Sequence, residues 1–279
     1  MTILDSLLHM LGQAFIQRAF IAGIILAILS SILSIFIVLK RVSLIGDGLG
    51  HTAFGGLALG YFLGIQQLVN WVASIVVILG SMGITKAIRS ARISGDAAVA
   101  LFLQLGLAAG GMLLSLARGF GVNLESLLFG SIILVNYEQI YIALAVLIAT
   151  LAIVFAFYKE LVLVTFDETQ AKAAGVRTWF FDYLVSALAG VVVMAAIPIV
   201  GVLLISALLV LPALTSLQVS RSFKQTMILS PVFGLLTVVL GLLLCIILDT
   251  APGATIVVVG LAIFLFVVVG RKIAGWNAR

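Results

Sequence analysis

Charged residues are scarce in this chain of 279 residues. Only 9% of the residues are Asp, Glu, Lys or Arg, whereas 64% are hydrophobic, and the mean hydropathy is +1.37. The apolar stretches repeatedly reach the ~20 residues that a helix needs to cross ~30 Å of hydrocarbon. A transmembrane β-barrel would instead show short segments of alternating polarity, and the sequence has continuous apolar runs in their place. These features predict an all-α, polytopic membrane protein.

Cysteine and the common catalytic motifs are also scarce. The single cysteine, Cys245, excludes a disulfide within the chain. The sequence has no GxxxxGK(S/T) phosphate loop, which excludes an ATPase of that type, and neither GxSxG nor HExxH, which disfavours an intramembrane hydrolase. The N-terminal stretch MTILDSLLHMLGQAF has no basic region and no small-residue cleavage site. We therefore expect no removed signal peptide.

The apolar stretches predict nine membrane-spanning helices, with eight as the alternative. The uncertain part is the run 182–219, which is broken only by Pro198. It is either two crossings or one long crossing followed by a partial one. The spans drawn from the sequence are 15–39, 43–64, 68–85, 97–117, 138–158, 182–197, 199–219, 226–247 and 253–270.

The basic residues predict the orientation of the spans. With nine spans, all Lys and Arg except Arg18 and Arg118 fall on one side of the membrane, which the positive-inside rule makes cytoplasmic. The C-terminus is then inside and the N-terminus outside. This asymmetry accounts for the net charge of +5, so no nucleic-acid partner is expected. The basic segments are 40–41, 86–92, 159–177, 221–224 and 271–279.

The largest polar insertion between spans is KELVLVTFDETQAKAAGVRTWFFD, residues 159–182. Thr165 or Asp167 can cap a short helix here, and Gly175 can end it. Composition alone leaves two interpretations open. The segment is either a solvated connecting loop or a small-faced helix that docks into a groove of a cytoplasmic partner.

The span SLIGDGLGHTAFGGLALGYFLG, residues 43–64, carries two ionisable side chains, Asp47 and His51. Their spacing of one helical turn places them on one face of a helix. An ionisable side chain at membrane depth is costly and should face a bundle interior or a water-filled path. Three interpretations fit: a structural hydrogen bond, a proton relay, or coordination of a metal such as zinc or manganese. Two ligands are too few for a tight site, but a symmetric dimer with this helix at its axis would supply four.

Three parts of the sequence resemble the permease family of ABC importers for divalent transition metals. They are KRVSLIGDGLGHTAFGGLALG at 40–60, FDETQAKAAGV at 166–176, and VGVLLISALLVLPALTSL at 200–217 together with DTAPGATIVVV at 249–259. The resemblance runs over nearly the whole chain.

This resemblance implies a fold and a set of functional residues. The fold would resemble the permeases of cobalamin and siderophore importers, in which two membrane subunits sit on two ATP-binding subunits. Residues 1–279 would form a single transmembrane permease domain, with 159–181 as its cytoplasmic coupling loop. Asp47 and His51 would form a transient metal site shared across a homodimer. The residues expected to couple the permease to the ATPase are Asp167, Glu168, Ala171, Ala174 and Gly175.

The resemblance also implies a function. We expect a permease subunit, not an enzyme, in a bacterial-type cell membrane, with an extracytoplasmic metal-binding protein as a further partner. No cofactor would be bound permanently, and Zn²⁺ or Mn²⁺ would be the transported substrate. The runs VGVLLISALLVLPA and LDTAPGATIV favour zinc over manganese, although the same nitrogen and oxygen ligands serve both metals. The alternative is a proton-coupled secondary metal carrier that uses the same pair, Asp47 and His51.

Overall fold

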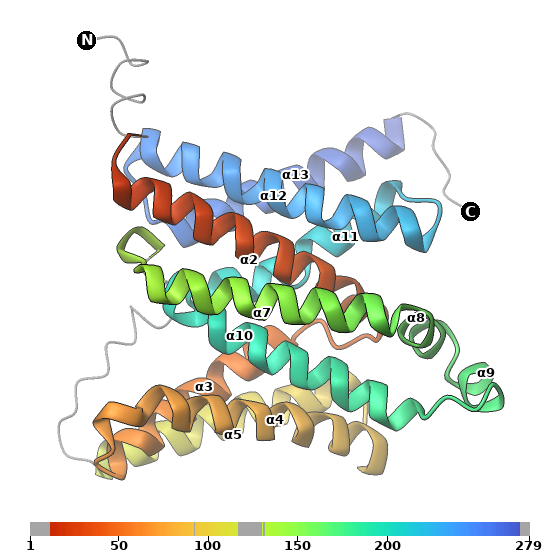
Figure 1. Ribbon diagram of the computed structural model, residues 1–279, viewed down its shortest axis with the longest axis horizontal. Helices are drawn as coiled ribbons and strands as arrows, with labels where there is room; N and C mark the ends of the chain where they lie inside the picture. The colour runs from red at the N-terminus through yellow and green to blue at the C-terminus, as the bar shows by residue number, and fades with distance from the viewer. Residues whose placement is uncertain (1–11, 92, 117–129, 131, 274–279) are drawn as a thin grey trace. The chain divides into compact units, whose positions relative to one another are not determined.

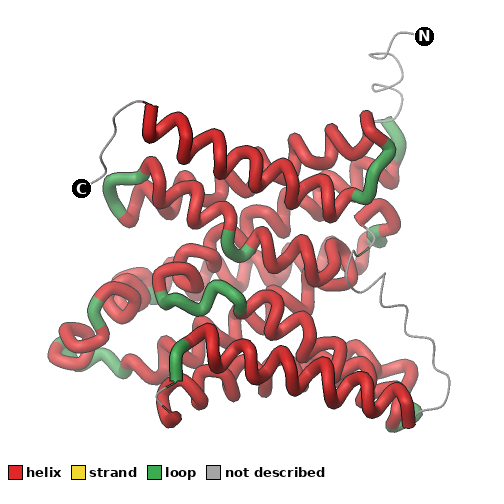
Figure 2. The backbone as a smooth tube through the Cα atoms, turned by 180° about the vertical axis from the view of Figure 1, so that it is seen from behind, coloured by secondary structure: helices red, strands yellow, loops and turns green. Residues whose placement is uncertain are grey.

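A computed structural model of the chain describes residues 12–91, 93–116, 130 and 132–273. These residues form helices joined by short loops, with no strand among them (Figures 1 and 2), which confirms the predicted all-α class. The elements in chain order are α2 (Ala14–Leu39), α3 (Ile45–Phe62), η1 (Gln66–Leu68), α4 (Val69–Ala91), α5 (Gly95–Leu116), η2 (Ile132–Leu134), α7 (Tyr137–Ala156), α8 (Tyr158–Phe166), α9 (Glu168–Ala173), α10 (Thr178–Leu208), α11 (Leu211–Val219), α12 (Phe223–Leu248) and α13 (Pro252–Ile273).

Seven helical segments in the described part of the chain are long and apolar enough to cross a membrane. Two differences separate this number from the predicted eight or nine. The predicted spans 182–197 and 199–219 lie in one continuous candidate, Thr178–Val219. The predicted span 43–64 forms α3, which is not among the seven because Asp47, His51 and its many glycines lower its hydropathy.

The run 182–219 is interrupted twice, first at Gly201 and again at 209–210 between α10 and α11, whereas the sequence predicts a single break at Pro198. Pro198 is inside α10, and the backbone leaves helical geometry at Gly201, with φ 76° and ψ 170°. A helix in a bundle tolerates the loss of the backbone hydrogen bond that proline cannot donate, because neighbouring groups bond to the freed carbonyl oxygen. A positive φ, in contrast, is easily adopted only by glycine. Gly201 therefore sets the position of the break within α10.

The chain divides into two compact units. The first comprises Met1–Ile35, Leu128–Leu147 and Ala195–Arg279, and the second comprises Phe36–Leu127 and Ile148–Met194. The prediction of a single permease domain over residues 1–279 stays a prediction.

Glycine allows close helix packing within the second unit, where α3, α4 and α5 lie side by side (Figure 1). A Cβ atom added at Gly56 of α3 would lie 2.7 Å from the Cα of Ala73 in α4. A Cβ at Gly106 of α5 would meet the backbone of His51 and Thr52. These contacts bring three helix backbones together without large side chains between them, as small residues do in membrane bundles.

The first unit contains a second group of packed helices, α11, α12 and α13. Gly241 of α12 faces Ile256 of α13, where an added Cβ would lie 2.7 Å from the Cα of Ile256. Ser230 of α12 donates a hydrogen bond of 2.8 Å to the carbonyl oxygen of Ser31 in α2. Polar side chains and small residues thus join the apolar helices of this unit.

Candidate metal half-site and coupling segment

Asp47 and His51 lie on the least covered side of α3. The helix begins at Ile45, and Asp47 lies in its first turn, where a carboxylate interacts favourably with the helix dipole. The neighbouring residues of α3 are buried against α4 and α5, whereas Asp47 and His51 are only half-buried. Residues four apart on a helix lie one turn apart on the same face. Helix α3 therefore places the pair on one face, as the spacing predicts.

The pair alone does not complete a metal site. No group of three or more His, Cys, Asp and Glu side chains that could hold an ion is found in residues 12–91, 93–116, 130 and 132–273. One imidazole nitrogen and one carboxylate oxygen are suitable ligands for manganese or zinc. Any tight site that uses Asp47 and His51 needs ligands from outside this set.

The segment 159–182 contains the short helix that the sequence predicts. Asp167 is the N-cap of α9, and its Oδ1 atom accepts hydrogen bonds of 2.9 Å from the backbone nitrogens of Thr169 and Gln170. The other candidate cap, Thr165, instead donates to the carbonyl oxygen of Leu161 within α8. Gly175 follows the helix with φ 79°, which is the left-handed conformation expected at a helix C-terminus.

The five predicted coupling residues differ in their exposure. Glu168, Ala174 and Gly175 are exposed, and Asp167 is half-buried. Ala171 is completely buried, so its methyl group packs α9 against the protein and offers no surface to another subunit. A docking surface on this segment would be made by the exposed residues.

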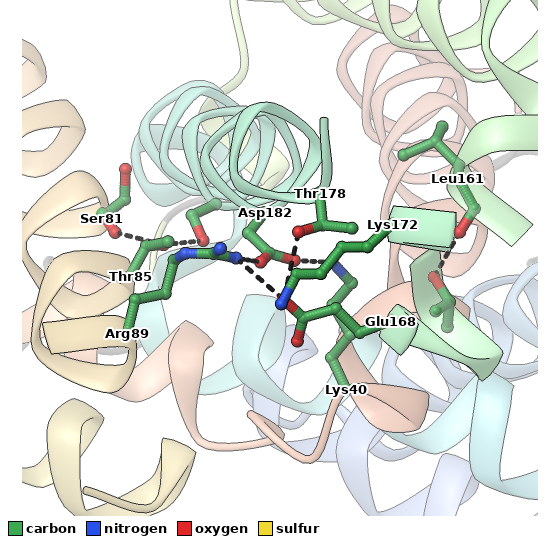
Figure 3. A network of polar contacts seen from close by, with 11 residues as sticks. Lys40, Ser81, Thr85, Arg89, Leu161, Glu168, Lys172, Thr178 and Asp182 are labelled. Atoms are coloured by element: carbon green, nitrogen blue, oxygen red, sulfur yellow. Dashed lines mark hydrogen bonds and ion pairs between the residues drawn. The ribbon is translucent and has the colours of Figure 1, made fainter. Parts of the chain in front are cut away.

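Asp182 joins two basic residues that are distant in sequence. One of its carboxylate oxygens is paired with Lys40 and the other with Arg89 (Figure 3). The same Arg89 nitrogen lies 3.6 Å from Oε1 of Glu168, and Lys172 lies 2.8 Å from that oxygen. We call Lys40, Arg89, Glu168, Lys172 and Asp182 the charge network.

Thr178 adds a hydroxyl to the network, since it donates a hydrogen bond of 3.1 Å to Oε1 of Glu168. The hydrogen bond from Lys172 lowers the pKa of the Glu168 carboxyl, and the contacts with Thr178 and Arg89 act in the same direction. Partial burial opposes this shift. Glu168 is thus held in its charged form, facing the rest of the unit.

Sequence reasoning missed the charge network as a unit. It used Lys40 and Arg89 only as orientation signals and Asp182 only as the end of the polar insertion. The available signal was that all three lie at ends of predicted spans, where opposite charges can meet. Which ends meet depends on helix packing, and that is visible only in the structure.

Comparison with known proteins identifies the family. The model of the ABC 3 transport family matches residues 12–271. The manganese transport system membrane protein MntC of Halalkalibacterium halodurans is 29% identical over 256 residues, which cover 92% of this chain and 87% of that protein. The manganese import system permease protein ScaB of Streptococcus gordonii is 33% identical over 251 residues, covering 90% and 89%.

A solved structure agrees with the sequence comparison. The structure of PsaBC from Streptococcus pneumoniae in complex with Fab contains a chain that is 31% identical to this one, with a TM-score of 0.81 and coverage of 95% of each chain. This similarity confirms the predicted resemblance over nearly the whole chain. The chain belongs to the ABC 3 transport family and is a membrane permease subunit of a metal importer, not an enzyme.

Proposed function

We propose that the chain forms the membrane path of an ATP-driven manganese importer. The observation that carries this proposal is that relatives matching about nine tenths of the chain are named for manganese transport. The preference for zinc that the runs at 200–213 and 248–257 suggested finds no support in these names. Zinc remains the competing substrate, because an imidazole and a carboxylate bind either metal.

Asp47 and His51 provide a transient site for the ion in this proposal. They are half-buried on one face of α3 and supply only two ligands, so a second copy of the chain would complete a four-ligand site. A transport site must bind weakly enough to release its ion. Two half-sites that separate during the transport cycle satisfy that requirement.

ATP binding and hydrolysis take place on separate cytoplasmic subunits in this proposal, two copies for each permease dimer, and an extracytoplasmic protein delivers the metal. Support comes from the family match and from the exposed residues of α9 and its C-terminal turn, which are accessible to a partner subunit. The distribution of basic residues supports a cytoplasmic position for this segment and for the C-terminus.

The proposal is tested by metal uptake into cells that lack the gene and carry variants of it. Asp47→Asn and His51→Gln remove one ligand each, and we expect uptake of Mn²⁺ to fall roughly tenfold or more, since even partners that only orient a metal ligand matter this much. Asp96→Asn is the matched control, because Asp96 is an exposed carboxylate in the first turn of α5. Its uptake should equal that of the unmodified chain at equal expression.

The same assay separates the metals. Competition between Mn²⁺ and Zn²⁺ should leave manganese uptake dominant when both ions are present at equal concentration. Preferential uptake of zinc would reverse the substrate assignment, and full uptake by the Asp47 and His51 variants would remove the pair from the metal path.

A further inference from the structure

The charge network joins three helix ends through one carboxylate. Lys40 directly follows α2, Arg89 lies in the last turns of α4, and Asp182 lies near the start of α10. The side chains of these three residues are 15%, 27% and 21% exposed. Charges this protected from water are screened weakly, and removing one partner leaves the other uncompensated.

The network also reaches the coupling helix. Arg89 uses a single nitrogen to approach both Asp182 and Glu168, and Glu168 is the first residue of α9. Figure 3 shows the Asp182 carboxylate between Arg89 and Lys40, with a second contact from Arg89 to Glu168. One guanidinium nitrogen of Arg89 thus lies near a carboxylate of α9 and a carboxylate of α10 at once.

Lys40 connects the charge network to α3. It forms an ion pair with Asp182 and lies in the connection between α2 and α3. The short connection after Lys40 leads into α3, whose first turn carries Asp47. Arg41 in this connection has a positive φ of 57°. Its carbonyl oxygen packs against Gly95, where an added Cβ atom would lie only 2.7 Å from that oxygen. Only this short, closely packed connection separates the ion pair of Lys40 from the first turn of α3.

A cavity of about 440 Å³ adjoins the charge network. The five residues of the charge network line it, together with Thr85, Ser186 and apolar residues of α2, the α2–α3 connection, α3, α4, α8 and α10. The ion pairs of the network therefore join helices around this cavity. The apolar lining residues are Ile37, Val42, Ile45, Ile88, Val164 and Val185.

We propose that Lys40, Arg89 and Asp182 are positioning residues that transmit the displacement of α9 to the metal ligands on α3. The inference rests on the proposed function, since it requires that α9 meets an ATP-driven partner. Glu168 receives the displacement, Arg89 and Asp182 carry it across the cavity, and Lys40 delivers it to the helix that bears Asp47. Such a network links two sites when both bias its arrangement.

The experiment measures Mn²⁺ transported per ATP hydrolysed by the complete importer, purified with its ATP-binding subunit and reconstituted in liposomes. Asp182→Asn and Arg89→Gln break the path across the cavity, and we expect the ratio to fall roughly fivefold or more while ATP hydrolysis continues. Lys86→Gln is the matched control. Lys86 is an exposed basic residue of α4, three residues before Arg89 and outside the charge network, so the ratio should not change.

Further variants distinguish positioning from folding. Arg89→Lys keeps the charge and should recover part of the ratio, and Lys40→Gln should lower it as Asp182→Asn does. If Asp182→Asn yields no stable complex, Lys40→Gln and Arg89→Gln decide the question. Unchanged ratios in these two variants overturn the inference, and so does a parallel loss of both rates with loss of the ATP-binding subunit. An unmodified complex that moves no Mn²⁺ contradicts the proposed function itself, which is a separate outcome.

Discussion

Gly106 and Gly111 lie on the same helix, α5, but only one of them is required for packing. A Cβ at Gly106 would lie 2.8 Å from the backbone nitrogen of Thr52 and would also meet the carbonyl of His51. Nothing lies within 4 Å of the corresponding position at Gly111. The single methyl group of alanine should therefore have opposite consequences at the two sites.

Gly106→Ala should destabilise the protein by about 1–3 kcal/mol, because α3 must move away from α5 to make room. Gly111→Ala should be neutral or slightly stabilising, since alanine favours the helix more than glycine does. Thermal unfolding of the two purified variants in detergent measures the difference. Equal melting temperatures would show that α3 and α5 do not approach this closely.

The residue scale also shows a limit of sequence reasoning. The 27 glycines predict that helices pack closely. Their number does not reveal that Gly106 meets the backbone of a predicted metal ligand and that Gly111 meets nothing. This distinction requires the register of α5 against α3, which depends on the packed unit and on no local signal.

At the scale of elements, α9 is a helix of only six residues whose ends are set by its own sequence. Asp167→Ala removes the acceptor for the backbone nitrogens of Thr169 and Gln170, at a cost of about 1 kcal/mol to the helix. We expect these two amides to exchange hydrogen roughly fivefold faster, because the first turn opens more often. Hydrogen exchange of the purified protein measures this change.

Asp167→Ser is the control for this experiment, because a serine hydroxyl can also accept the capping hydrogen bonds. Its exchange rates should stay near those of the unmodified chain. Unaltered exchange in Asp167→Ala would mean that tertiary contacts, such as the buried Ala171, hold the first turn without the cap.

The sequence predicts the elements whose ends are set by nearby residues. It does not predict features that depend on packing between residues far apart in the chain. The cap at Asp167 and the turn at Gly175 follow from residue types and their spacing, so the sequence predicts α9 almost to its ends. The break at Gly201 was assigned to Pro198, because the sequence does not show which of two helix-breaking residues the bundle accommodates. The pairing of Asp182 with Lys40 and Arg89 joins residues far apart in the chain, so no local pattern contains it.

At the scale of the whole molecule, Asp47 and His51 need a partner that the described residues do not supply. Both side chains are half-buried on one face of α3, while most of that helix is buried and packs on α4 and α5. Two ionisable groups on a membrane helix are costly unless a further polar partner faces them. In the proposed dimer each copy supplies that partner to the other, which explains the incomplete ligand set of the pair.

Cross-linking tests this arrangement. Two ligands of one ion lie within roughly 4 Å of each other, so His51→Cys in both copies should bring two thiols within reach of a short thiol cross-linker in native membranes. Leu101→Cys is the control, because Leu101 is 61% exposed on α5 and is not on the proposed axis. The unmodified chain measures the background from the buried Cys245. Cross-linked dimers should form with His51→Cys and not with Leu101→Cys or the unmodified chain. Dimers that form only with Leu101→Cys would place α3 away from the two-fold axis. In that case Asp47 and His51 of two copies could not share one ion.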